Sequence, residues 1–472
     1  MVDDKPREYC GLCGVTGGEG VLERLHAGLH SLQHRGQEAA GVMVGNGAEC
    51  RLHKQPGLVG ALFGCLPTAW LDPRFGIARG IGHVRYGTAG GSLAVNAQPL
   101  MVNMAGQTVG IAHNGTLCNA GALRRELQAE GALFQTTTDT ELILHLMARA
   151  LLRRCHGNLW EALAEALRQV QGAYSLLLMT ADTMVAARDP YGWRPLAIAD
   201  TSDGSYVVAS ETIAFGVTGA TTLRDVEPGE MVIWDHNNRI TSQRFAEAPR
   251  HAHCIFEHVY FARPGSRVFG DSVYEVRKAM GRQLAREAPV DADVIVPVPD
   301  SGLYAALGFA EQSGIPLDLA LSRNHYVGRT FIDPALKASR LQQAGAKLQP
   351  IPEAIAGKRV CLIDDSIVRG NTSRSRVGSL RAAGAREVHL RVSCPPHRYG
   401  CFFGIDFPER AALFANQVPA GDLCRSLRLD SLHYLSQAGM LSCVKAHPPE
   451  DYCCACFDGQ YPVRPEGLPD DL

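Results

Sequence analysis

Two adjacent aspartates, Asp364 and Asp365, follow the apolar run Val360 to Ile363 and precede a turn of small residues. The polar and backbone-permissive residues of that turn and its continuation are Ser366, Arg369, Gly370, Asn371, Thr372 and Ser373. Unpaired N–H groups at the start of a helix bind phosphate, and paired carboxylates bind ribose hydroxyls or hydrated Mg²⁺. The stretch therefore predicts a ribose-phosphate and metal site, although an ordinary strand-to-helix turn with capping residues has a similar composition.

A second set of reactive side chains occurs within the first 141 residues. Cys10 is a candidate nucleophile, and Arg85 supplies a guanidinium for a substrate carboxylate. Asn114 and the Gly115 N–H are candidate donors to an oxyanion, and Asp139 is a candidate ligand for an amino group. A single early cysteine is also typical of a core residue on a first strand, so the assignment depends on the later groups.

The chain has 15 cysteines, and most of them lie beyond residue 250. Six of these are candidate metal ligands: Cys254, Cys394, Cys401, Cys453, Cys454 and Cys456. Cys453 and Cys456 form a C-x-x-C, which in a cytosolic protein binds zinc, does redox chemistry or arises by accident. Four cysteines spread over a domain also hold a cubane iron–sulfur cluster, and spacing alone does not decide between cluster and zinc.

Composition limits the kind of protein that carries these groups. The 472 residues predict two domains, and with 46% apolar and 20% charged residues both are expected to be globular. A net charge of −2 argues against nucleic acid or an anionic membrane as the main partner, which favours a small-molecule ligand. The charged N-terminus is no signal peptide, and no apolar run reaches membrane-spanning length, so we expect a cytoplasmic protein without a disulfide framework.

The elements that must position these groups fall into two patterns, with a boundary expected near 245. Before it, strands are predicted near 80–85, 107–113, 174–180, 206–209 and 231–234, and helices near 22–32, 120–128, 140–152 and 159–170. After it, strands at 294–298, 360–364 and 388–392 alternate with helices near 273–287, 302–313 and 373–383. The first pattern indicates α+β layers and the second a parallel sheet, while the Pro-rich end from 461 is expected to be a loose tail.

Most of residues 10–230 resembles the class II glutamine amidotransferases, through the stretches around Arg85, Asn114 and Asp139 together with Leu32 to Glu38. The resemblance implies an N-terminal nucleophile hydrolase domain with αββα layers over residues 10–245, preceded by a propeptide of residues 1–9. It assigns the following roles: Cys10 as nucleophile, Asn114 and Gly115 as oxyanion donors, and Arg85, Thr88 and Asp139 as glutamine ligands. The family's usual Phe is Cys13 here, a thiol without an assigned role.

The stretch 359–373 resembles the loop of type I phosphoribosyltransferases that binds phosphoribosyl pyrophosphate (PRPP). This implies an α/β domain with a parallel sheet over residues 246–472. It assigns PRPP binding to Asp364, Asp365, Ser366, Arg369, Gly370, Asn371, Thr372, Ser373 and Arg329, and Mg²⁺ binding to Ser301, Asp364 and Asp365. The segment 323–332 resembles the loop that closes over PRPP, and it begins with Arg323 where the family usually has Lys.

Taken together, the two halves resemble the family of glutamine PRPP amidotransferases, in its branch with a propeptide and a 4Fe-4S centre. The implied reaction converts glutamine, PRPP and water to 5-phospho-β-ribosylamine, glutamate and pyrophosphate, the first committed step of purine synthesis, with ammonia passed internally. The resemblance implies Cys254, Cys401, Cys453 and Cys456 as ligands of a structural or regulatory cluster. It further implies a homo-oligomer, dimer or tetramer, and purine nucleotides as feedback inhibitors.

Two other functions share parts of this pattern. A regulator that only binds PRPP would need a DNA-binding element and a basic face, and neither is visible in the sequence. Hexosamine- or asparagine-forming amidotransferases share the first half but would lack the stretch 359–373, so that stretch decides against them.

Overall fold

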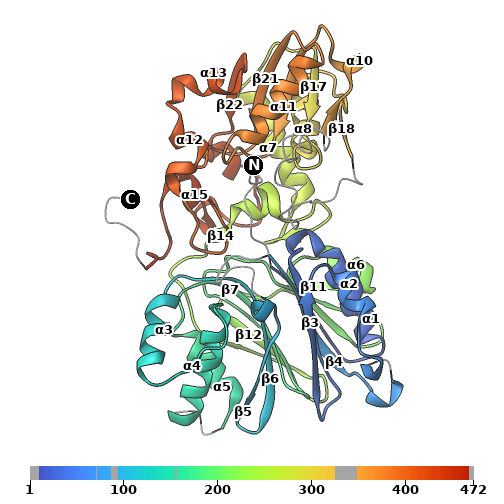
Figure 1. The fold of residues 1–472 in the computed structure, drawn as a ribbon, viewed down its shortest axis with the longest axis vertical. Coiled ribbons are helices and arrows are strands. Elements are labelled where there is room, and N and C mark those ends of the chain that lie inside the picture. The colour runs from blue at the N-terminus through green and yellow to red at the C-terminus, as the bar shows by residue number, and fades with distance from the viewer. Residues whose placement is uncertain are drawn as a thin grey trace.

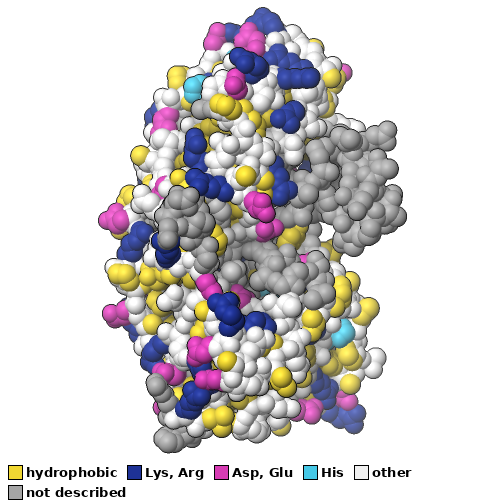
Figure 2. All heavy atoms as spheres, turned by 60° about the vertical axis from the view of Figure 1, so that its left-hand side comes forward, with side chains coloured by type: hydrophobic (Ala, Val, Ile, Leu, Met, Phe, Trp, Pro, Cys, Tyr) yellow, Lys and Arg dark blue, Asp and Glu magenta, His cyan; other side chains and the backbone are white. Residues whose placement is uncertain are grey.

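The two halves of the chain form two lobes that meet along one junction (Figure 1). The structure is a computed structural model that describes residues 10–70, 72–86, 94–153, 155, 157–324 and 348–466. The predictions for residues 1–9, Thr88 and Arg329, and for most of the segment 323–332, lie outside the described residues. On the face shown in Figure 2, basic, acidic and apolar side chains are interspersed.

The N-terminal lobe contains two antiparallel sheets. In the described part of the chain, the first sheet has the strand order β11-β9-β10-β1-β4-β2-β3. These strands are β1 (Gly11–Thr16), β2 (Ala39–Gly45), β3 (Cys50–Pro56), β4 (Arg79–Arg85), β9 (Ala197–Asp200), β10 (Tyr206–Ala209) and β11 (Thr221–Asp225). The first sheet packs against α1 (Val21–Ser31), α2 (Val59–Gly64) and α6 (Ile213–Thr218).

The second sheet has the order β13-β12-β8-β7-β6-β5 within the described residues. Its strands are β5 (Leu100–Met104), β6 (Gln107–Leu117), β7 (Gly172–Met179), β8 (Met184–Arg188), β12 (Glu230–Trp234) and β13 (Ile240–Arg244). The helices α3 (Ala120–Ala129), α4 (Thr140–Arg153) and α5 (Leu159–Leu167) cover its outer face (Figure 1). The inner faces of the two sheets meet through buried side chains such as Leu12 and Leu177, so the predicted αββα layering is confirmed.

The C-terminal lobe contains the predicted parallel sheet. Its described strands have the order β17-β20-β21-β22, and each neighbouring pair is parallel. They are β17 (Val294–Pro297), β20 (Arg359–Asp364), β21 (Glu387–Val392) and β22 (Ser431–Tyr434). The principal helices of this lobe are α7 (Val273–Glu287), α8 (Leu303–Ser313) and α11 (Asn371–Ala382). The sequence pattern did not predict β22, because three of its residues are half-buried, His433 is exposed, and the strand lacks a continuous apolar run.

Short elements join the lobes. The two-residue strands β14 (His253–Cys254) and β23 (Tyr452–Cys453) pair in parallel near the junction, followed by η5 (Glu257–Phe261) and α15 (Ala455–Asp458) respectively. The expectation of a loose tail from 461 is wrong as far as residue 466. Tyr461 Oη donates to the Gly400 carbonyl at 2.9 Å, and Glu466 accepts from the Ala122 N–H at 2.8 Å. These bonds fasten the C-terminal segment to both lobes.

None of the described helices is long and apolar enough to cross a membrane.

Candidate functional site

Cys10 directly precedes β1, an interior strand of the first sheet. In the β1–β4 pair Gly11 lies opposite Val84, and continuing this register places Cys10 beside Arg85. Arg85 is buried at the end of β4, and Cys10 is half-buried. The candidate nucleophile and the candidate guanidinium ligand therefore share one end of the first sheet.

Asn114 and Gly115 lie on β6 of the second sheet. Asn114 is 3% exposed, and among the described residues its Nδ2 has no hydrogen-bond partner. Gly115 has a φ of 142°, and a Cβ there would lie 2.1 Å from the Ala173 carbonyl oxygen, so only glycine fits. A buried donor without a partner costs about 1–3 kcal/mol, which a ligand oxygen at this position would offset.

Asp139 lies just before α4 and is 8% exposed. Its Oδ2 accepts a hydrogen bond from the Leu117 N–H at 2.8 Å, and its Oδ1 lies 3.5 Å from His113 Nδ1. Burial by itself raises the pKa of the Asp139 carboxyl, but the His113 ring and these hydrogen bonds outweigh it and hold that pKa below its usual value. The group is thus a carboxylate at neutral pH, anchored to the strand that carries Asn114.

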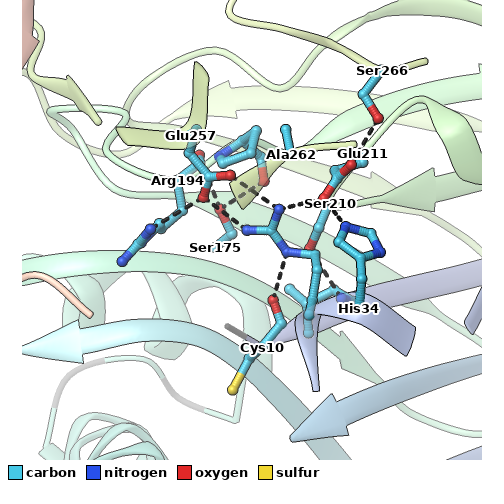
Figure 3. A network of polar contacts seen from close by, with 12 residues as sticks. Cys10, His34, Ser175, Arg194, Ser210, Glu211, Glu257, Ala262 and Ser266 are labelled. Carbon is cyan, nitrogen blue, oxygen red and sulfur yellow. Dashed lines mark hydrogen bonds and ion pairs between the residues drawn. The ribbon is translucent and has the colours of Figure 1, made fainter. Parts of the chain in front are cut away.

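A buried network of charges lies directly behind Cys10 (Figure 3). Arg35 Nε donates to the Cys10 carbonyl at 3.1 Å, and its Nη2 donates to Glu257 Oε1 at 2.7 Å. The same Glu257 oxygen accepts from Arg194 at 3.1 Å, and Arg194 Nη2 donates to the Phe403 carbonyl at 3.1 Å. Glu257 and Phe403 belong to the C-terminal half, so the backbone of the candidate nucleophile is hydrogen-bonded to a network that spans both lobes.

Glu211 forms the other arm of this network. It accepts from Arg35 at 2.5 Å, from the Arg263 N–H at 2.8 Å and from Ser266 Oγ at 2.7 Å, and His34 Nε2 lies 2.7 Å away. Burial alone would raise the pKa of the Glu211 carboxyl, but the charges of His34 and Arg35 lower it well below its usual value. Glu211 is therefore ionised, which balances the positive charge of Arg35 in a fully buried site.

The strand, acidic pair, turn and helix predicted at 360–383 are present in the C-terminal lobe. β20 ends at Asp364, Asp365 follows, and both aspartates are 1% exposed. α11 begins at residue 371, and its N-cap Gly370 has a φ of 77° with Phe414 Cδ2 only 2.6 Å from where a Cβ would lie. Ser366 and Ser373 are buried, and residues 369, 371 and 372 are half-buried. The turn thus presents a helix N-terminus beside two carboxylates.

The loop after β17 meets this turn. A Cβ at Gly302 would lie 2.3 Å from the Ile363 carbonyl oxygen, so the loop after β17 touches the carboxyl end of β20, where the turn begins. Ligands bind at such edges in open parallel sheets. Ser301, Asp364 and Asp365 offer the oxygen ligands that Mg²⁺ prefers, so the donor set fits the predicted metal. Arg323 forms an ion pair with Asp300 at this edge.

The four cysteines predicted to hold a cluster come together at the lobe junction. The β14–β23 register places Cys254 opposite Cys453, and Cys456 follows on α15. Burial raises the pKa of the Cys456 thiol well above its usual value, and the neighbouring thiols of Cys401, Cys254 and Cys453 raise it further. Three separate chain segments thus supply four thiols to one buried place.

The spacing of these thiols bears on which metal group fits. Tetrahedral zinc at a Zn–S distance of about 2.3 Å holds its sulfurs about 3.8 Å apart, whereas a cubane separates its ligand sulfurs further. Among the described residues, no three of these thiols lie within 4.8 Å of one another. Four cysteine thiols from one domain are a donor set that fits a 4Fe-4S cluster.

The remaining candidate thiols have other environments. Cys394 is buried after β21, and its Sγ donates to the Pro395 carbonyl at 3.3 Å. Cys454 is buried beside the four thiols, and burial raises its pKa, with a further contribution from Cys254. Cys13 is buried on β1, and burial raises the pKa of its thiol to about 12. Cys13 is thus an unreactive core residue, whereas Cys454 stays close enough to rival one of the four ligands.

Sequence reasoning gave no role to the charged residues of the network or to Arg376. Arg376 of α11 lies 2.7 Å from Asp364 Oδ2, twelve positions along the chain from it. Glu257 was visible as a charge inside the apolar stretch Ile255 to Phe261, which is a signal for a buried ion pair. Its partners are distant in the sequence, so only the fold identifies them.

Comparison with known proteins covers both lobes. A family model described as a glutamine amidotransferase domain matches residues 88–216. The amidophosphoribosyltransferase of Bacillus subtilis (strain 168) is 43% identical over 461 residues, which cover 97% of this chain and 94% of that protein. The chloroplastic amidophosphoribosyltransferase of Glycine max is 42% identical over 469 residues, covering 99% of this chain and 80% of the relative.

Solved structures agree with the sequence comparisons. A structure described as glutamine PRPP amidotransferase from B. subtilis complexed with ADP and GMP has a TM-score of 0.88 at 41% identity, covering 96% of this chain and 98% of that one. The similarity therefore includes the antiparallel sheets, the parallel sheet and the junction between them. The chain belongs to the amidophosphoribosyltransferase family.

Proposed function

We propose that the sites in the two lobes act in series on one reaction, with the residues named below in each role. The chain is an enzyme that uses the amide nitrogen of glutamine to convert PRPP to 5-phospho-β-ribosylamine, releasing glutamate and pyrophosphate. The observation that carries the division of labour is the pair of sites: a half-buried cysteine beside Arg85, and a helix N-terminus beside Asp364 and Asp365.

In the first site, Cys10 becomes the N-terminal residue after loss of residues 1–9. Its α-amino group, with an ordinary pKa of about 7.7–8.0, takes the thiol proton directly or through water. The sulfur attacks the side-chain amide carbon of glutamine, and Asn114 Nδ2 and the Gly115 N–H stabilise the oxyanion. The C–N bond then breaks, ammonia leaves with the proton, and water hydrolyses the thioester to glutamate. Arg85, Thr88 and Asp139 hold the substrate's α-carboxylate and α-amino groups.

In the second site, the turn 366–373 holds the 5′-phosphate, and Arg329 and Arg369 stabilise the pyrophosphate. Ammonia attacks C1 of PRPP, the bond to pyrophosphate breaks, and the configuration at C1 inverts. Ser301, Asp364 and Asp365 would hold Mg²⁺, which supplies positive charge to the leaving group. Closure of segment 323–332 would exclude water from C1.

We assign residues 10–245 to the glutaminase domain and 246–472 to the phosphoribosyltransferase domain. The last strand of the second sheet ends at Arg244 and the first paired residue of the next lobe is His253, which supports a boundary between them. Ammonia passes internally between the domains. The hydrogen bonds from Cys10 through Arg35 to Glu257 connect the first site to the C-terminal lobe, which supports an internal passage.

The thiols of Cys254, Cys401, Cys453 and Cys456 would hold a 4Fe-4S cluster that fastens η5 and the 401–404 segment together. Those segments carry Glu257 and Phe403, so the cluster would support the network behind Cys10. Anaerobically purified protein is expected to be brown, with iron and sulfide in equal amounts. Colourless protein containing zinc in these thiols would contradict the assignment.

Three further properties are proposed from the chain's similarity to its relatives. The B. subtilis structure contains ADP and GMP, which supports purine nucleotides as feedback inhibitors of this chain. A homo-oligomer, dimer or tetramer, and a cytoplasmic location complete the proposal.

One assay tests the division of labour. PRPP-dependent pyrophosphate release is measured with glutamine and with ammonia as donor, in the wild type and in Cys10→Ala. We expect Cys10→Ala to lose the glutamine-dependent rate and keep the ammonia-dependent rate. Cys13→Ala is the matched control, because its buried thiol has no part in the chemistry and both rates should persist.

Glutamine-dependent synthesis by Cys10→Ala would contradict the assignment of the nucleophile. Failure of the wild type with both donors would contradict the transferase assignment. Intact mass of the active enzyme tests the processing step, since retention of residues 1–9 at full activity would exclude Cys10 as an N-terminal nucleophile.

A further inference from the structure

Three histidines gather at the lobe junction, next to the proposed cluster ligands but separate from them. His251 and His253 are two positions apart on the segment that enters β14, and His447 comes from the segment that precedes β23. One ligand nitrogen from each ring lies within 4.8 Å of the other two. The ring centroids of His253 and His447 are 4.5 Å apart, and those of His251 and His253 are 5.3 Å apart.

His253 is 2% exposed, and its hydrogen bonds determine its tautomer. Its Nδ1 lies 2.8 Å from the Gly192 carbonyl oxygen, which can only accept, so Nδ1 carries the proton, and Arg188 Nη2, 3.4 Å from the same nitrogen, does not donate to it. Nε2 is then a lone-pair nitrogen, and among the described residues it has no hydrogen-bond partner. Imidazoles that bind metals commonly donate their other N–H to a backbone carbonyl in this way, which orients the ring.

We propose that His251, His253 and His447 form a site for a divalent metal ion of the zinc class. Neutral imidazole nitrogens are preferred ligands of such ions, and three of them leave a fourth tetrahedral position open. Asp451 is a candidate for that position, since its Oδ2 lies 3.5 Å from His251 Nδ1.

To bind zinc, the three ligand nitrogens need to move only slightly closer together. Zinc at Zn–N distances of about 2.0–2.1 Å holds tetrahedral ligand nitrogens about 3.4 Å apart. The His251 side chain is 39% exposed and His447 is half-buried, so both rings have room to turn toward the buried Nε2 of His253. The site is thus built around one fixed ring and two adjustable ones.

The position of the site indicates what the metal would do. His253 is fixed to Gly192 of the N-terminal lobe, whereas His447 and Asp451 lie in the segment that leads into β23. A metal held by these residues would fasten that segment to the N-terminal lobe, beside Cys254 and Cys453. The proposed role is structural and does not depend on the reaction assigned above.

The test is zinc binding by full-length protein purified with its iron content intact. Zinc is added, excess is removed by dialysis, and bound zinc is measured by mass spectrometry together with competition against a chromophoric chelator. We compare the wild type with His447→Gln and with His145→Gln, a control on α4 whose side chain is 25% exposed. His447 is half-buried, so its substitution is expected to leave the fold intact.

We expect wild type and His145→Gln to retain one more zinc per chain than His447→Gln. The Kd for zinc should rise at least about tenfold in His447→Gln, and zinc should raise the Tm of the wild type but not of this variant. His251→Gln should behave like His447→Gln. Equal zinc in the wild type and both histidine variants, or zinc lost only in Cys456→Ser, would overturn the proposal.

Discussion

Cys10 and Cys13 are three positions apart, yet their thiols have different environments. Cys13 is fully buried on β1, where burial raises its pKa to about 12 and keeps it protonated. Cys10 is half-buried at the strand end beside Arg85. A nucleophile must reach both substrate and a base, so position at the end of the strand distinguishes the two.

The amide of Asn114 should contribute to the rate of glutamine hydrolysis but not to the ammonia-dependent reaction. Asn114→Ala removes a buried donor that is without a partner among the described residues, so the glutamine-dependent rate should fall about 10²–10³-fold. The ammonia-dependent rate should persist. Asn103→Ala, in the neighbouring strand β5, is the control, because Asn103 is hydrogen-bonded to Thr108 on the outside of the hairpin. Parallel losses with both donors would contradict the role.

Buried His83 should make the protein less stable in mild acid. Burial above all lowers the pKa of His83 to about 3, whereas an unfolded histidine titrates near 6.5. Because the folded pKa is depressed, the unfolded state binds the proton first as pH falls below about 6.5, and stability declines from there toward pH 3. Between pH 7.5 and 5.5 the loss should be about 1 kcal/mol from this residue.

Urea denaturation of the full-length protein, followed through the unfolding of its N-terminal lobe, measures this loss at pH 7.5 and at pH 5.5. His83→Gln should show a smaller decline in midpoint than the wild type, and His236→Gln, an exposed histidine, should decline as the wild type does. An unchanged decline in His83→Gln would show that other groups cause the acid sensitivity.

The turn before helix α11 requires a glycine at its N-cap, residue 370. Gly370→Ala adds a Cβ 2.6 Å from Phe414 at a backbone φ of 77°, so the turn must shift. We expect weaker PRPP binding and a lower Tm. Gly378→Ala in the same helix meets nothing within 4 Å, and it should stabilise the helix by up to about 1 kcal/mol.

Isothermal titration with PRPP and Mg²⁺ separates these two variants. If Gly370→Ala bound PRPP as tightly as Gly378→Ala, the turn 366–373 would not be the phosphate site.

The two lobes are joined by buried charges as well as by apolar contacts. The side chains of Arg35, Glu257 and Arg194 are each at most 2% exposed. Burial alone would lower the pKa of Arg35. The carboxylates of Glu257 and Glu211 outweigh that effect and raise it, so the arginine stays charged. Such a network stabilises the fold only while each buried charge keeps its partner.

Glu257→Gln should therefore lower the stability of the whole molecule. It leaves Arg35 and Arg194 with one fewer counter-charge, at a cost of about 3 kcal/mol, seen as a lower Tm. Because Arg35 also holds the Cys10 carbonyl, the glutamine-dependent rate should fall more than the ammonia-dependent rate. Glu311→Gln, which breaks an exposed pairing with Lys278 and Arg282, should change neither rate. Equal loss of both rates in Glu257→Gln would indicate a purely structural network.

The sequence by itself determined the elements and the local site chemistry. The helix predicted at 273–287 is α7, and the strand, acidic pair and helix at 360–383 are β20, the turn and α11, because apolar periodicity and turn residues act over short distances. The stretches around Arg85, Asn114 and Asp139 were likewise recognised from neighbouring residues within each stretch, although the stretches themselves lie far apart along the chain.

Only the tertiary structure decided which distant groups meet. The Arg35–Glu257 pair joins residues 222 positions apart, and Arg194 reaches Phe403 across 209 positions. His251, His253 and His447 likewise come together from two ends of the C-terminal half. Charged and imidazole side chains carry no periodic signal that names a distant partner, so their pairing depends on how the two lobes pack.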